Sequence, residues 1–320
     1  MIRSIKEWNY QEEMTMKIKK VALLGAGAVG AYFIWGLSQR MGDDFCVIAN
    51  GTRKERLEKE GLIINGKQYA LNVKTPDEVK DVDLLLVSSK QDALEDALDE
   101  IKSMVGKNTI VISLLNGVIS EEMIGKAIGM EHMLYSVMRI ASVRKGNEIT
   151  FIPEITAGVF IGEKDCKERT ERVLAVEELF ENAGIHHHFM EDIVLDMWQK
   201  YASNVAQNLP QAILSVGFQA YTDSQHVNYI ARQLWKEVAR VANAKGIPLS
   251  EEFTLFQGVK PAARFSTLQD LDAKRHTEIE MLAGEMIRMG KEYGIAVPYC
   301  EYTYHLIKAL EEKNDGKFEY

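Results

Sequence analysis

The sequence Val21-Ala22-Leu23-Leu24-Gly25-Ala26-Gly27-Ala28-Val29-Gly30 places a short apolar run directly before a G-x-G-x-x-G loop, and a helical pattern follows to about Arg40. A strand, a glycine loop and a helix in this order are typical of a dinucleotide-binding βαβ unit. Free amides at the start of the helix would face the phosphates. The alternative is a structural turn that binds nothing. We predict that a dinucleotide pyrophosphate contacts Gly25, Ala26, Gly27, Ala28, Val29 and Gly30.

Short β-rich runs alternate with helical stretches as far as residue 189, which indicates parallel βαβ units. The runs expected to form the parallel sheet are 21–24, 45–49, 84–88, 109–114 and 133–137. The segments 149–151 and 159–162 are expected to continue it antiparallel, before a helix over 168–183. The segment 61–73, with Asn65-Gly66 at its centre, is predicted to be an inserted hairpin.

The pattern changes after Asp192, where amphipathic helical segments follow one another and no convincing strand is found. We therefore predict an α/β N-terminal domain of the Rossmann type, with a doubly wound parallel sheet, and an all-α C-terminal domain. The expected boundaries are 1–16 for an N-terminal extension, 17–190 for the nucleotide-binding domain and 191–320 for the helical domain.

Composition excludes several classes of protein. The 320 residues are 46% hydrophobic and 27% charged, which is ordinary for a globular protein, and the net charge of −9 does not favour a nucleic-acid partner. The three cysteines (Cys46, Cys166 and Cys300) lie far apart, so neither disulfides nor a zinc site is expected. The first 16 residues are too polar for a secretory signal, and the apolar runs are too short to span a membrane. We expect a cytoplasmic protein with no membrane partner.

The segment after the second expected strand bears on which cofactor binds. An NAD site usually has an acidic residue about 20 residues after the loop, but here the sequence is Ala49-Asn50-Gly51-Thr52-Arg53-Lys54-Glu55-Arg56. No carboxylate ends the strand, while Arg53 can supply positive charge to a 2′-phosphate. The alternative is that these basic residues form a solvated helix start. We predict NADP(H), bound in part by Asn50 and Arg53.

Polar residues in the helical half form two candidate clusters. Lys200, Asn204 and Asn208 are spaced by four and would share one helical face, although a lone lysine on a helix is usually a surface residue. Asp270 and Glu278 are eight residues apart and would lie within about 80° of each other on one helix. The alternative is that this helix only presents an exposed charged surface.

Two polar residues after expected strands and one run of histidines are further candidates for binding sites. Lys90 and Asn116 follow expected strands at their carboxyl ends, where doubly wound sheets bind ligands. The consecutive histidines 186–188 would point to alternating faces of a strand, and no companion cluster is present, so no metal is predicted.

Together these motifs resemble the ketopantoate reductase family (2-dehydropantoate 2-reductases) from residue 17 to about residue 312. The resemblance rests on segments that follow in the family's order: the glycine loop, Lys90, Asn116-Gly117, Trp198-Gln199-Lys200 with Asn204 and Asn208, Ser266, Leu268-Gln269-Asp270, Arg275 through Glu280, Gly284 and Gly294-Ile295-Ala296-Val297-Pro298. It implies a Rossmann domain, a helical domain, NADPH and a substrate cleft between the domains.

The resemblance also implies residue roles. Lys200 would be the general acid and Glu278 a ligand of the substrate hydroxyl, Asn116, Asn204, Asn208 and Ser266 would line the substrate site, and Lys90 and Asn116 would lie near the cofactor. An ammonium suits this chemistry because hydride attack on a ketone builds negative charge on the oxygen. The chain departs from the family pattern at Asn50, where relatives commonly have arginine, and in Asn208-Leu209-Pro210-Gln211-Ala212.

We therefore expect NADPH-dependent reduction of a small branched, anionic 2-oxo acid, with 2-dehydropantoate going to pantoate, a step in pantothenate and coenzyme A biosynthesis. One alternative is a reductase of a different 2-oxo acid. Another is a non-catalytic NADP-binding regulatory module, which the retention of both Lys200 and Glu278 disfavours. A homodimer is left open as the assembly.

Overall fold

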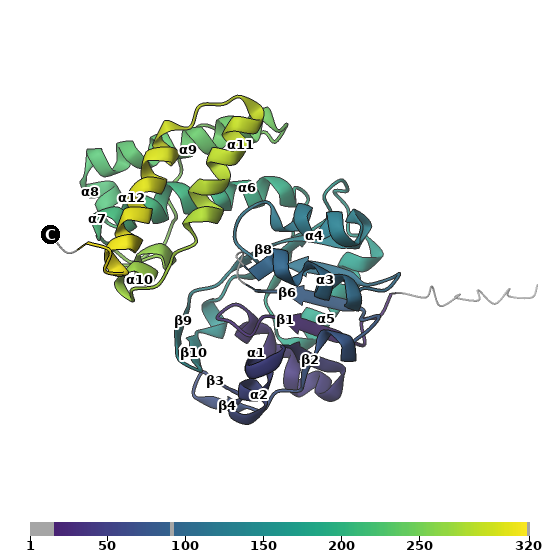
Figure 1. Ribbon diagram of the computed structural model, residues 1–320. Helices are drawn as coiled ribbons and strands as arrows, with labels where there is room; N and C mark the ends of the chain where they lie inside the picture. The colour runs from purple at the N-terminus through teal and green to yellow at the C-terminus, as the bar shows by residue number, and fades with distance from the viewer. Residues whose placement is uncertain (1–15, 90–92, 319–320) are drawn as a thin grey trace, which may run out of the picture.

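The computed structural model describes residues 16–89 and 93–318, so most of the expected extension 1–16 lies outside the described residues. Figure 1 shows two parts, an α/β part built on a sheet and a helical part that joins it through α6 (Ile193–Ser203). This arrangement confirms the predicted fold class.

The main sheet has eight strands in the order β12-β11-β8-β7-β6-β1-β2-β5. Its strands are β1 (Val21–Leu24), β2 (Phe45–Ile48), β5 (Val73–Lys74), β6 (Leu84–Val87), β7 (Ile110–Ser113), β8 (Met133–Arg139), β11 (Gly158–Gly162) and β12 (His187–Phe189). From β5 to β8 all neighbours are parallel, and β1 lies between β2 and β6, with Val21 opposite both Phe45 and Leu84. The strands β1, β2, β6 and β7 are buried throughout, which explains their continuous apolar sequences.

A second sheet of four strands, in the order β4-β3-β10-β9, corrects one prediction. Its strands are β3 (Leu62–Ile64), β4 (Lys67–Tyr69), β9 (Ser142–Lys145) and β10 (Glu148–Phe151). The hairpin within 61–73 is confirmed, with Asn65 and Gly66 at φ 51° and 77°. The segment 159–162 does continue the main sheet antiparallel to β8, but 149–151 does not, because β10 pairs with β3 and β9.

The helices of the α/β part are α1 (Gly30–Met41), α2 (Gly51–Glu60), α3 (Leu94–Met104), α4 (Ser120–Ile128) and α5 (Glu171–Ala183). The helix predicted over 168–183 begins three residues later, because the Thr170 side chain accepts a hydrogen bond from the Val173 amide and caps it. It ends at Gly184, which has φ 67°.

Every regular element from residue 193 to residue 318 is helical, as expected for the second part. After α6 come a π-helical turn (Asn204–Asn208), α7 (Leu209–Leu214), α8 (Ala220–Asp223), α9 (Gln225–Ala244), α10 (Ser266–Asp272), a second π-helical turn (Glu280–Gly284), α11 (Glu285–Tyr293) and α12 (Pro298–Asn314). Of the described helices, none is long and apolar enough to cross a bilayer.

One hydrophobic core continues from the sheet into the helical part. Tyr135 and Val137 of β8 belong to the same buried cluster as Met197, Trp198 and Tyr201 of α6. Because α6 packs on β8, it holds its polar side chains at the carboxyl end of the sheet, where open α/β sheets bind ligands.

Candidate active site

The glycine loop between β1 and α1 is packed too closely at two of its three glycines to accept a side chain. Gly25 has φ 109°, and a Cβ there would lie 2.6 Å from the backbone of Ser88. A Cβ on Gly30 would lie 2.1 Å from the Gly25 carbonyl oxygen, so this position also needs glycine. A Cβ on Gly27 would instead meet no atom within 4 Å, so the space at the start of α1, where a phosphate group would approach the helix amides, is open.

Asn50 and Arg53, the predicted ligands of the adenosine end, lie where β2 meets α2. Asn50 precedes the helix, and its Nδ2 donates to Glu100 Oε1 at 2.5 Å. Glu100 belongs to α3, so the structure brings a carboxylate to the end of β2 that the local sequence did not predict. Arg53 is exposed on the first turn of α2. Lys90 lies outside the described residues.

Lys200, Asn116 and Glu278 form a chain of hydrogen bonds between the two parts of the molecule. Lys200 Nζ donates to Asn116 Oδ1 at 2.8 Å and to the Met138 carbonyl oxygen at 2.7 Å. Asn116 Nδ2 in turn donates to Glu278 Oε2 at 3.2 Å. Three residues that the sequence analysis proposed from separate motifs therefore meet at one place.

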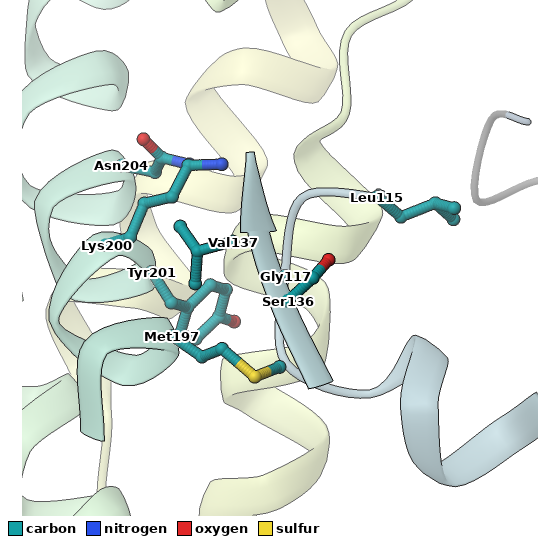
Figure 2. Close-up of a pocket in the computed structure, with 8 residues that line it drawn as sticks. All are labelled: Leu115, Gly117, Ser136, Val137, Met197, Lys200, Tyr201 and Asn204. Carbon is teal, nitrogen blue, oxygen red and sulfur yellow. The ribbon is translucent and has the colours of Figure 1, made fainter. Parts of the chain in front are cut away.

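Figure 2 shows the pocket beside this chain, into which Lys200 and Asn204 project from neighbouring helical turns. Opposite them lie the end of β8 and the loop after β7. The lining residues are Leu115, Gly117, Ser136, Val137, Met197, Lys200, Tyr201 and Asn204. Tyr201 donates from its hydroxyl group to the Leu282 carbonyl oxygen at 2.5 Å, which fixes α6 against the segment that follows Glu278.

The environment of Lys200 lowers its pKa to about 8. Burial is the larger cause, and the positive charge of Arg139 adds to it, while Glu278 and Asp196 act in the opposite direction. Arg139, at the end of β8, donates to Asp196 Oδ1 at 2.6 Å and stacks on the Phe160 ring. A lysine with this pKa exchanges protons near neutral pH, as a general acid must.

Asn208 does not join Lys200 and Asn204 at the pocket. Residues 204–208 form a π-helical turn that continues directly from α6. Asn204 lines the pocket with Lys200, whereas Asn208 is buried and absent from the lining. The structure therefore brings Lys200 and Asn204 together at the pocket, and the role of Asn208 in the substrate site stays a prediction.

The two residues of the second predicted cluster, Asp270 and Glu278, lie in different segments. Asp270 and Glu278 do not share a helix, because α10 ends at Asp272 and Lys274 has a φ of 52°. Asp270 instead forms a salt bridge with Arg275 at 2.7 Å. Glu278 follows the break and reaches Asn116.

Ser266 is the exposed first residue of α10 and makes none of the contacts given above for Lys200, Asn116 and Glu278. Gln211, which stands where the chain departs from the family pattern, accepts from the Phe265 amide at 2.6 Å and donates to the Ala263 carbonyl oxygen at 3.0 Å. This buried side chain holds the segment that leads into Ser266, a role that only the structure reveals.

The three consecutive histidines have separate contacts. Each imidazole lies within hydrogen-bond distance of a backbone carbonyl: His186 of Thr156, His187 of Ile185 and His188 of Ala157. In the part of the chain that the structure describes, no group of three or more His, Cys, Asp or Glu side chains is placed to hold a metal ion.

Family models, curated relatives and solved structures match most of this chain. The family model "Ketopantoate reductase PanE/ApbA" matches residues 21–162, and that for the C-terminal part of the same family matches residues 192–311. A 2-dehydropantoate 2-reductase of Pyrococcus horikoshii is 31% identical over 310 residues, which covers 93% of this chain and 99% of the relative.

Two solved structures have the same fold and are 25% identical in sequence to this chain. Each similarity covers 92% of this chain and 99% of the chain in the solved structure. One is a ternary complex of D-mandelate dehydrogenase with NADH and anilino(oxo)acetate, with a TM-score of 0.80. The other is a ketopantoate reductase of Ralstonia eutropha, with a TM-score of 0.77.

Proposed function

Because the chain belongs to the ketopantoate reductase family, a family of oxidoreductases, we propose that it reduces a small branched 2-oxo acid with NADPH, and that 2-dehydropantoate is this acid and pantoate the product. The observation that carries the proposal is the chain of hydrogen bonds from Lys200 through Asn116 to Glu278, at the carboxyl end of the sheet. The glycine loop that opens α1 lies at this same end.

Each residue of the chain has a proposed task. A nicotinamide cofactor, when bound at the glycine loop, would supply the hydride that reduces the carbonyl carbon. Lys200 stabilises the negative charge on the carbonyl oxygen and donates its Nζ proton to it. Asn116 holds the ammonium group in place through its Oδ1 atom, and Glu278 contacts the hydroxyl or carbonyl edge of the substrate. Asn204 lines the pocket beside them.

The preference for NADPH rests on charge near the end of β2. Arg53 stands on the first turn of α2, and Asn50 itself offers no carboxylate to compete with a 2′-phosphate. A guanidinium group is the usual partner of a phosphate in proteins.

A second candidate, an NADH-dependent dehydrogenase of another 2-hydroxy acid, is favoured by one observation. Glu100 places its carboxylate against Asn50, close to where NAD sites have an acidic residue for the ribose hydroxyl. The D-mandelate dehydrogenase with the same fold binds NADH.

The experiment is to follow NADPH and NADH oxidation with purified protein against 2-dehydropantoate, phenylglyoxylate and pyruvate. We expect the highest kcat/KM for 2-dehydropantoate with NADPH, and one pantoate formed for each NADPH consumed. Higher kcat/KM with phenylglyoxylate and NADH would establish the second candidate. NADPH binding without turnover of any 2-oxo acid would instead indicate a regulatory module. Light scattering on the same sample tests the homodimer.

A further inference from the structure

Three arginines from two distant segments of the chain lie near one another, and one of them contacts the glycine loop. Arg53 and Arg56 lie on α2, and Arg144 lies on β9. The fold brings them together because β10, the partner of β9, pairs in parallel with β3, the strand that follows α2. Figure 1 shows α2, β3, β10 and β9 on the same side of the molecule as α1.

Arg144 spans the gap between this second sheet and the glycine loop. Its Nε donates to the Gly146 carbonyl oxygen at 2.9 Å, within its own hairpin. Its Nη1 donates to the carbonyl oxygen of Ala26 at 3.4 Å, which places the guanidinium group against the predicted phosphate-binding turn. These contacts leave other N–H donors of the planar guanidinium for a ligand.

The three positive charges are close enough to affect one another. Desolvation lowers the pKa of Arg53, and the charge of Arg56 lowers it further. Desolvation likewise lowers the pKa of Arg144, and Arg53 and Arg56 both contribute. In residues 16–89 and 93–318, no carboxylate forms a salt bridge with any of the three. A cluster of like charges without an acidic partner favours the binding of an anion.

We infer that Arg144 is a further determinant of cofactor specificity and that it binds the 2′-phosphate of NADPH together with Arg53. The backbone amides at the start of α1 and the open space at Gly27 already suit the pyrophosphate. The second phosphate of NADPH lies on the adenosine ribose, which such folds hold near the end of β2, where α2 and its arginines begin. This inference rests on the proposed preference for NADPH.

The inference is tested by binding, without turnover. Dissociation constants are measured for NADPH and NADH by fluorescence, and for 2′,5′-ADP and 5′-AMP by calorimetry, because the last two differ only in the 2′-phosphate. For Arg144→Ala we expect binding of NADPH and 2′,5′-ADP to weaken by roughly ten- to a hundredfold, with NADH and 5′-AMP unchanged. Arg53→Ala should likewise reduce the preference for NADPH over NADH.

Lys145→Ala is the matched control. Lys145 is the next residue on β9, so its exposed side chain points to the opposite face of the strand, and the substitution removes the same charge. Its binding constants should equal those of the wild type. Arg144→Lys keeps the positive charge and should keep part of the preference for NADPH over NADH, and unchanged NADH binding by Arg144→Ala excludes misfolding as the cause of the loss.

The possible results distinguish the role inferred for Arg144 from the proposed preference for NADPH. If the wild type prefers NADPH and Arg144→Ala keeps the full preference, the assignment of Arg144 is wrong and the cofactor proposal stands. An equal loss for NADPH and NADH would place Arg144 at the pyrophosphate and overturn the inference. If the wild type binds both cofactors equally, the proposed preference fails, and the assignment of Arg144 fails with it.

Discussion

Lys200 on α6 donates a hydrogen bond to Asn116 Oδ1 across a separation of 84 residues in the chain. Asn116 follows β7, so this bond fixes the ammonium group of the helical part at the carboxyl end of the parallel sheet. The same asparagine donates to Glu278 with its amide nitrogen. One side chain therefore sets the relative positions of the proposed general acid and the proposed substrate ligand.

The first prediction concerns the proton donor. Lys200→Ala should lower kcat by roughly a hundredfold or more, because the substrate oxygen loses both its proton source and its stabilising charge. NADPH affinity should stay nearly unchanged, since the glycine loop is intact. Steady-state kinetics and a fluorescence titration of NADPH measure the two effects.

Lys126→Ala is a suitable control for this substitution. Lys126 is an exposed lysine of α4 and does not line the pocket, so its loss should leave kcat unaltered. A Lys200→Ala protein that folds normally and turns over at the wild-type rate would show that the proton comes from another group.

The second prediction concerns pH. The pKa of Lys200 is about 8, and the protonated form is needed for reduction. The kcat for reduction should therefore be constant below about pH 8 and fall tenfold per pH unit above it. Oxidation of the hydroxy acid needs the neutral amine, so its kcat should rise through the same range. A profile of kcat for reduction that stays flat to pH 10 would contradict this assignment.

Arg139 supplies a sharper form of the same test. Its charge lowers the pKa of Lys200, and Asp196, to which it is bonded, raises it. In Arg139→Gln the positive charge is lost and Asp196 is left without its partner, so both changes should move the break in the pH profile above 8. Asp196→Asn should move it below 8.

The sequence indicates the fold well wherever a strand is buried on both faces. The strands β1, β2, β6 and β7 are continuous apolar runs because helices cover a parallel sheet on both sides. The strand β10 alternates between exposed and buried residues, and this pattern does not specify which sheet it joins. Its position depends on pairing with β3, a contact between distant segments that local sequence does not encode.

The candidate site was predictable in its residue types but not in its arrangement. Lys200, Asn116 and Glu278 come from three separate segments, and only the packing of α6 on β8 brings them together. Helical periodicity placed Asn204 beside Lys200, but it could not predict that Asn208 is buried and does not line the pocket. No sequence motif indicates Arg139, because its effect on the pKa of Lys200 depends only on how close the two side chains lie in the fold.

The third prediction concerns Glu278. Glu278→Ala should raise KM for the 2-oxo acid and also lower kcat, because the substrate loses a ligand and Asn116 loses the partner of its amide. NADPH affinity should be retained. Kinetics and cofactor binding are measured on one preparation. Weaker NADPH binding with unchanged substrate parameters at saturating cofactor would mean that Glu278 serves the cofactor.

The fourth prediction concerns Glu121, a buried carboxyl group on α4 that accepts from the Ser120 hydroxyl at 2.9 Å. Burial raises its pKa from 4.5 to about 7. The folded state thus binds this proton more tightly than the unfolded state does, and the contribution of Glu121 to stability falls as the pH rises from about 4.5 to about 7.

Glu121→Gln keeps the shape of the side chain and carries no charge, so it should raise the free energy of unfolding at pH 8 by on the order of 1 to 3 kcal/mol. At pH 5, where the wild-type carboxyl is protonated in the folded state, the gain should fall to less than about 1 kcal/mol. Urea unfolding at both pH values measures the difference. Glu122→Gln is the control, because its partly exposed salt bridge to Lys245 at 2.8 Å should contribute less than about 1 kcal/mol at either pH. An equal effect of Glu121→Gln at pH 5 and pH 8 would show that packing, and not the buried charge, accounts for the change.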